Sequence, residues 1–206
     1  MVMYFDPDRE KGSLCDETDI KKMKEMYSSP YIELTSHGYY GGTSFFGVSS
    51  LEDQLDDFAN VKRTTENMGM TITSMAPPNN AVNADTVQAF KQYPEYKALM
   101  VKQSNDATLN KNGFFNEENG FETFWKSIDV EVGGTGKTDT VENLKTKWNA
   151  AMDKDYDYVM LQAHPGGWAD GGEAETNMYE FLLWLKSQGV VFMHATEYAE
   201  YVSALN

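Results

Sequence analysis

Short apolar segments alternate with amphipathic helical segments along almost the whole chain of 206 residues. The apolar segments are rich in β-branched and aromatic residues, which is typical of buried strands. We expect strands at 2–5, 31–37, 70–75, 96–101, 128–132, 158–164 and 190–194. We expect helices at 16–27, 51–68, 86–93, 138–152, 176–188 and 196–205. This α/β alternation predicts a mostly parallel sheet, either open or closed into a barrel.

Side chains that cap helices stand at several of the expected helix ends. Ser49 or Ser50, with Asp53 following, forms a capping arrangement before the second helix. Asn83 or Asp85 can cap the third helix, and Gly69 stands where the second one ends. Local sequence therefore supports the helix positions independently of their apolar spacing.

Composition limits the number of domains and the classes of partner. With 41% hydrophobic residues the chain can bury one sizeable core, so we expect a single domain over residues 1–206. The net charge of −15 argues against nucleic acid and anionic membrane surfaces, because both need clustered Lys and Arg. We expect no membrane span and no signal peptide, and Cys15 permits no internal disulfide. The protein is then either intracellular or a piece of a secreted chain.

Two histidines stand at the ends of expected strands and open into glycine-rich aromatic loops. His37 is followed by Gly-Tyr39-Tyr40, and His164 is followed by Pro-Gly-Gly-Trp168. Enzymes with α/β folds place their chemistry at the carboxyl ends of strands, so both histidines are candidate site residues. The three aromatic side chains suit stacking on sugar rings, although Trp168 can equally cover the core. His194, the third histidine, is expected only to bond nearby backbone.

Several ordered segments together resemble the NodB-type polysaccharide deacetylases. They are Glu33-Leu-Thr-Ser-His37-Gly-Tyr-Tyr, Asn67-Met-Gly69, Ala76-Pro-Pro-Asn, Leu161-Gln-Ala-His-Pro-Gly-Gly-Trp168 and Val190-Val-Phe-Met-His-Ala-Thr-Glu197-Tyr. The resemblance runs from about residue 2 to the C-terminus. It implies a distorted (β/α) barrel, here without its first strand, and an enzyme that removes acetyl groups from an amino sugar or an acetylated glycan.

The resemblance also implies roles for particular residues. His37 corresponds to a metal-binding histidine and His164 to the catalytic acid, with zinc as the expected metal. Pro77, Tyr39, Tyr40 and Trp168 correspond to the substrate-binding region. A carbohydrate partner and a secreted or cell-envelope location follow from the same likeness.

This chain departs from the family pattern at several catalytic positions. Gly41 stands where the family has a second metal-binding histidine, and Met75 stands in place of an arginine. The family's Asp-Asp pair belongs upstream of Met1, and Asp6 and Asp8 stand too close to His37 to replace it.

These departures leave three alternatives open. In the first, the missing ligands are replaced by Glu33, Asp129 or Asp170. In the second, the domain is inactive and serves as a carbohydrate-binding or scaffold domain. In the third, it is an intracellular interaction module.

A second motif, Gly133-Gly-Thr-Gly-Lys-Thr138, is similar to a phosphate-binding loop between a strand and a helix. The phosphate-binding pattern requires glycine where Glu131 stands, and a carboxylate there would repel a nucleotide. We therefore interpret this segment as a flexible Gly/Thr loop.

Overall fold

The structure is a computed structural model, and it describes residues 2–3, 17–40, 45–101, 122–125, 128–129, 139–153, 158–163 and 172–205. The chain divides into two compact units. Unit 1 comprises Met1–Trp125 and Met193–Asn206, and unit 2 comprises Lys126–Phe192. Compactness alone does not separate one folding domain from two, so the single domain over residues 1–206 stays a prediction.

Unit 1 contains a parallel sheet whose strands follow one another in sequence order. Its strands are β1 (Val2–Met3), β2 (Thr35–Ser36), β3 (Ser74–Met75), β4 (Ala98–Val101) and β5 (Glu122–Trp125), paired in the order β1-β2-β3-β4-β5. All four pairs are parallel. A doubly wound sheet reverses its strand order at a switch point, whereas a (β/α) barrel adds each strand beside the previous one. The order within unit 1 is of the second kind, and the closed barrel stays a prediction.

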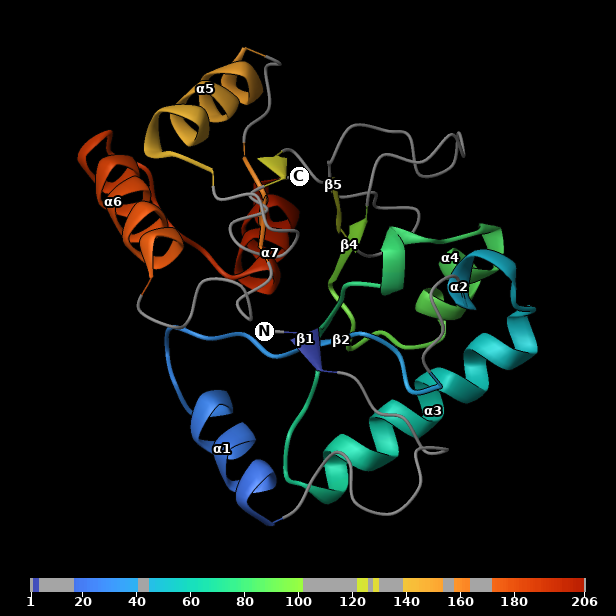
Figure 1. Cartoon of the computed structure of the whole chain (residues 1–206). Helices are drawn as coiled ribbons and strands as arrows, with labels where there is room; N and C mark the ends of the chain where they lie inside the picture. Colours follow the sequence, from blue (N-terminus) through green and yellow to red (C-terminus); the bar gives the residue numbers. More distant parts are fainter. Residues whose placement is uncertain are drawn as a thin grey trace. The chain divides into compact units, whose positions relative to one another are not determined.

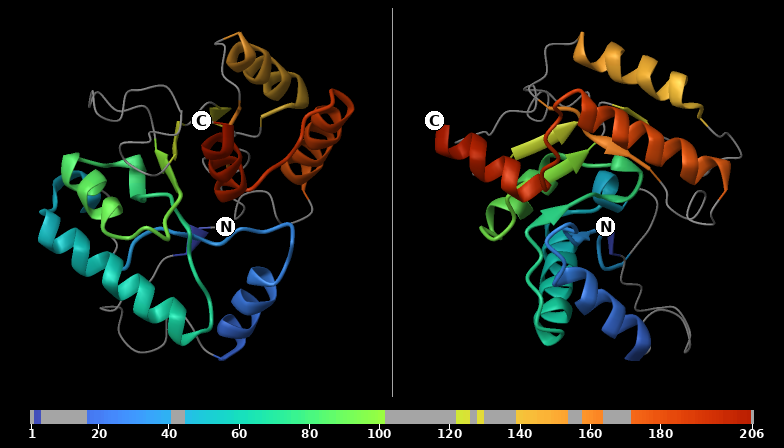
Figure 2. Two further views of the ribbon diagram at one scale, coloured as in Figure 1. Left: turned by 180° about the vertical axis from the view of Figure 1, so that it is seen from behind. Right: turned by 90° about the vertical axis from the view of Figure 1, so that its left-hand side faces the viewer.

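Two of the described helices of unit 1 begin at side chains that cap them. The described helices of this unit are α1 (Glu17–Tyr27), α2 (Phe45–Val48), α3 (Leu51–Asn67), the 3-10 helix η1 (Pro78–Asn80), α4 (Ala84–Lys91) and α7 (Ala195–Leu205). Ser50 and Asp53 form the expected capping box of α3, and Asn83 caps α4. Helices α3 and α4 contact each other (Figure 1), and α7 contacts β4 (Figure 2).

Aromatic rings dominate the core of unit 1. Phe58 of α3 lies at its centre, 2% exposed, with ring centroids at 6.1 Å from Phe46, 5.4 Å from Phe90, 5.2 Å from Tyr93 and 5.1 Å from Tyr96. Most of these pairs are edge-to-face, the geometry that aromatic quadrupoles favour. The cluster joins α2, α3 and α4 to the segment before β4.

The described residues of unit 2 form two parallel strands and two helices. They are β6 (Ile128–Asp129), β7 (Leu161–Gln162), α5 (Val141–Met152) and α6 (Glu173–Ser187). Helices α5 and α6 lie side by side (Figure 2) over a core of Leu144, Ala151, Ala174, Met178, Phe181 and Leu185.

One strand expected from the sequence is wrong, and three of the described elements, β5, α2 and η1, were missed. Residues 190–194 form no strand, and Val191 and Phe192 are 77% and 54% exposed. Their β-branched and aromatic composition favours a strand only where neighbouring strands cover it. Strand β5 and helix α2 were not expected, since β5 directly follows a polar segment and α2 is only 4 residues long.

Candidate functional site

His37 directly follows β2, at the carboxyl edge of the sheet. Its Nδ1 lies 2.5 Å from the carbonyl oxygen of Ala76, which directly follows β3. The backbone N–H of Ala76 donates to the Ser36 carbonyl oxygen at 2.8 Å, so the two strand ends are joined twice. A carbonyl oxygen can only accept, and Nδ1 therefore carries the imidazole proton in this arrangement. This bond sets the ring orientation and makes Nε2 the basic nitrogen.

The loop after His37 is held by side chains through three successive backbone N–H groups. The N–H of Gly38 donates to Ser36 Oγ at 3.1 Å. The N–H groups of Tyr39 and Tyr40 donate to one oxygen of Asp57, Oδ2, at 2.7 and 3.0 Å. Loops usually leave such groups to water, so residues 37–40 are unusually constrained for a surface connection.

Asp57 belongs to the buried face of α3 and is 1% exposed. Burial raises the pKa of its carboxyl group to about 6, while the N–H groups of Tyr40 and Tyr39 oppose this shift and Asp56 adds to it. Sequence reasoning missed Asp57. Its spacing was informative, because Gln54, Asp57 and Val61 follow each other at three and four residues and all three are buried.

The two tyrosines of the loop have different surroundings. Tyr39 packs against the core of unit 1, and its ring meets that of Tyr40 edge-on at 5.2 Å. Tyr40 is 38% exposed, its hydroxyl donates to a carboxylate oxygen of Asp56, and Asn60 Nδ2 donates to the same hydroxyl at 2.9 Å. The bond to Asp56 is the main cause that raises the pKa of Tyr40 to about 12. Of the two rings, Tyr40 is the more accessible to a ligand.

Gly38 is required by both the conformation and the packing of this loop. Its φ of +92° lies in the left-handed region, and a Cβ atom would stand 2.9 Å from the ring carbon Cε2 of Phe46. We expect Gly38→Ala to lower the free energy of unfolding by about 1–2 kcal/mol. Urea unfolding measures the change, with Gly69→Ala as the control, since Gly69 has a similar φ of +75° and no atom within 4 Å of the added Cβ. Equal losses in both variants would contradict the role of the Phe46 contact.

Other expected site residues lie elsewhere or outside the described residues. Pro77 directly precedes η1 and is buried, so its ring offers little area to a ligand. His164 and Trp168 lie outside the described residues, as do Gly41, Asp6, Asp8, Asp170 and the motif at 133–138. The approach of His37 and His164 to one another stays a prediction.

The bonds and the position of Glu33 do not support its role as a substitute metal ligand beside His37. One of its carboxylate oxygens accepts from the Thr196 N–H at 3.1 Å and the other from the Thr196 hydroxyl at 2.6 Å, at the start of α7. Thr196 Oγ1 also lies 2.9 Å from Thr73 Oγ1, just before β3. Glu33 therefore marks the amino edge of the sheet, and four extended residues place His37 roughly 13 Å away at the other edge.

Asp129, a candidate substitute ligand, and His194 belong to other elements than His37. Asp129 lies on β6 of unit 2. The backbone N–H of His194 donates to the Glu197 carboxylate at 2.9 Å, and its Nδ1 lies 3.7 Å from the same oxygen, so His194 belongs to the start of α7. In the part of the chain that the structure describes, no three His, Cys, Asp or Glu side chains are grouped to hold a metal ion. His37 fits one position of such a site.

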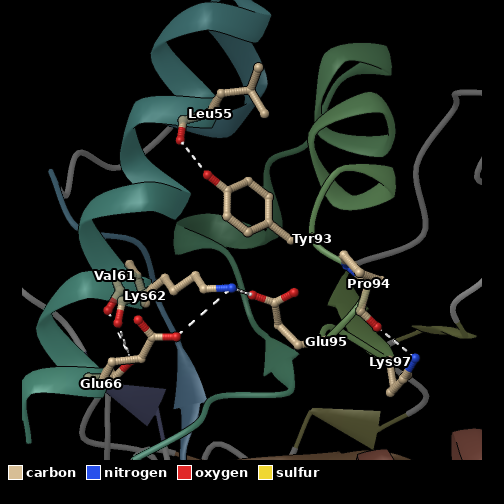
Figure 3. A network of polar contacts seen from close by, with 9 residues as sticks. Leu55, Val61, Lys62, Glu66, Tyr93, Pro94, Glu95 and Lys97 are labelled. Carbon is tan, nitrogen blue, oxygen red and sulfur yellow. Dashed lines mark hydrogen bonds and ion pairs between the residues drawn. The ribbon is translucent and has the colours of Figure 1, made fainter.

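A pocket of about 130 Å³ lies on the amino side of β3 and β4, away from His37. Its charged lining is a network in which Lys62 Nζ lies 2.6 Å from Glu95 and 3.9 Å from Glu66 (Figure 3). The remaining lining residues are Thr65, Thr71, Ile72 and Tyr96. A space of this size suits a few water molecules and is too small for a sugar ring.

No family model matches this chain, and no curated protein is significantly similar to it. Among the described helices, none combines the length and the apolar character needed to cross a membrane. The functional proposal therefore rests on the resemblance in the sequence and on the geometry around His37.

Proposed function

We propose that this chain is a polysaccharide deacetylase-like hydrolase, acting at the carboxyl edge of its parallel sheet on acetyl groups of an amino sugar or an acetylated glycan. The observation that carries the proposal is the bond from His37 Nδ1 to the Ala76 carbonyl oxygen, 2.5 Å long. A histidine that binds a metal or moves a proton needs a fixed ring orientation and a basic second nitrogen. This bond supplies both.

A divalent metal, with zinc as the expected ion, belongs to the proposal. His37 Nε2 would hold it, together with ligands outside the described residues. When bound, such an ion lowers the pKa of its water and polarises the acetyl carbonyl. His164 is proposed as the acid that protonates the leaving group, and a secreted or cell-envelope location belongs to the same proposal.

Tyr40 is the proposed contact for the sugar ring at this edge, with Trp168 as a second one. The aromatic face of Tyr40 offers stacking, and its hydroxyl is held by Asp56 and Asn60, so its ring is oriented before a ligand arrives. The same arrangement favours the second candidate function, a carbohydrate-binding or scaffold domain that keeps the fold without catalysis. That function needs Tyr40 and does not need His37.

The test of hydrolysis measures zinc content and acetate release from acetylated chito-oligosaccharides with the full chain. We expect bound zinc and acetate release in the wild type, and a loss of roughly 100-fold or more in His37→Ala, because a metal site with an open position needs about three protein ligands. His194→Ala is the matched control, since that imidazole stands by α7, and its activity should stay near the wild-type level. If the protein binds no zinc and releases no acetate, whichever divalent ion is added, the enzyme function is excluded.

Glycan binding separates the second candidate from the first. If the chain is a binding domain, Tyr40→Ala should weaken the affinity for the oligosaccharide about tenfold, because one stacking contact is lost. His37→Ala should leave the affinity unchanged. Tyr31→Ala is the control, because Tyr31 is 89% exposed. Isothermal titration of the full chain measures the affinities, and equal values for all three variants would exclude a sugar contact at Tyr40.

A further inference from the structure

Asp57 places a carboxylate where an apolar side chain would pack at lower cost. It lies on the buried face of α3 between Gln54 and Val61, and only 1% of its surface is exposed. Burying a carboxylate costs several kcal/mol unless its bonds compensate, and apolar replacements of buried ionic groups are often neutral or stabilising. Stability of α3 alone therefore does not explain an aspartate at this position.

The bonds of Asp57 go to the loop that carries the candidate site. Its Oδ2 accepts the N–H groups of Tyr39 and Tyr40, and charge-assisted bonds of this kind are stronger than neutral ones. These are adjacent residues, so one oxygen fixes the peptide plane between them and the direction in which each side chain leaves the loop. A water molecule in place of the carboxylate would satisfy the same donors without fixing them.

The loop is held from three elements at once. Ser36 of β2 accepts the Gly38 N–H, Ala76 after β3 accepts from His37 Nδ1, and Asp57 of α3 accepts the next two N–H groups. Every residue from 37 to 40 thus makes a specific bond to a neighbouring element. A surface loop fixed at every residue is the form of support that a preorganised binding or catalytic site needs.

We propose that Asp57 is a positioning residue of the proposed site: through the N–H groups of Tyr39 and Tyr40 it holds residues 37–40 in the conformation in which His37 is bonded to Ala76. Asp57 acts through the loop and contacts no substrate. This inference rests on the proposed function for its consequences in zinc binding and acetate release. Its structural consequence, the protection of two loop amides, is independent of that function.

The experiment compares three variants of the full chain. Asp57→Asn keeps a carbonyl oxygen that can accept both N–H groups, Asp57→Ala removes the acceptor, and Asp57→Leu removes the acceptor while filling the space. Glu52→Gln, which removes an exposed carboxylate from the same helix, is the control. Circular dichroism establishes that each variant is folded.

The first measurement is hydrogen exchange of the Tyr39 and Tyr40 amides by NMR. We expect exchange about tenfold faster or more in Asp57→Ala and Asp57→Leu, the effect of losing roughly 1.4 kcal/mol of hydrogen bonding, and a change under about threefold in Asp57→Asn. Unchanged exchange in Asp57→Leu would overturn the proposal, and this variant decides the result if Asp57→Ala does not fold.

The second measurement is the zinc affinity and acetate release of the same variants. Residues that orient a metal ligand typically contribute 10–100-fold, so we expect about that loss in Asp57→Leu and recovery in Asp57→Asn. A purely structural role would predict full activity in a folded Asp57→Leu, and that result would also overturn the proposal. If the wild type neither binds zinc nor releases acetate, the proposed function fails, while the exchange rates still decide whether Asp57 positions the loop.

Discussion

Phe58→Ala is expected to lower the free energy of unfolding by about 4 kcal/mol. The side chain is 2% exposed and its ring contacts four others, contributed by α2, α4 and the segment from Tyr93 to Tyr96. Truncation removes the transfer free energy of the ring and leaves a cavity that rigid aromatic neighbours fill poorly. Urea unfolding followed by circular dichroism measures the loss.

Two further variants separate the cavity from nonspecific effects. Phe58→Leu keeps most of the volume and should lose about 1–2 kcal/mol. Tyr31→Ala removes an aromatic ring that is 89% exposed and should change stability by less than about 0.5 kcal/mol. A loss below about 1.5 kcal/mol in Phe58→Ala would show that this cluster does not carry the core of unit 1.

The helices were predictable because their signals are local. The Ser50–Asp53 capping box and the Asn83 cap depend only on residues within one turn, and both are present in the structure. Gly69 was expected to end α3 and has a φ of +75°, which glycine adopts without strain. Helix bounds could therefore be read from the sequence to within a few residues.

Strands were less predictable because pairing partners decide them. Residues 190–194 have the composition of a buried strand, yet they are unpaired, and Val191 is 77% exposed. The strand expected from residue 31 to His37 is a strand only at Thr35–Ser36, where Ser36 pairs with Met75 of β3. Sequence shows which segments are able to extend, and their neighbours determine where a ladder forms.

The candidate site was predictable where it depends on strand ends. His37 follows β2 as expected, because an apolar segment followed by glycine marks the carboxyl end of a strand. Asp57 was missed because a carboxylate within a helix usually faces water. Glu33 was considered as a substitute ligand that the fold would bring close to His37, but residues before and after one strand lie at opposite edges of the sheet.

Titration of Asp57 should make the protein less stable as the pH rises from about 3 to 7, relative to variants without this carboxyl group. In the folded protein its pKa is raised by burial to about 6, against an ordinary value of 3.8. Between these two values the folded state binds more protons than the unfolded state, so the free energy of unfolding falls as the pH rises. The contribution of this single group is on the order of 3 kcal/mol over the whole window.

Asp57→Asn isolates this contribution, because every other titrating group is shared with the wild type. The difference in free energy of unfolding between variant and wild type should shift by about 3 kcal/mol in favour of the variant from about pH 3 to 7. Asp57→Leu also lacks the carboxyl group and should give a parallel curve, whatever its absolute stability. A difference that stays constant with pH, or that moves in favour of the wild type, would show that Asp57 is not buried as a carboxylate. The two loop amides favour that charged form and burial opposes it, so the direction of the change with pH shows which of the two effects is larger.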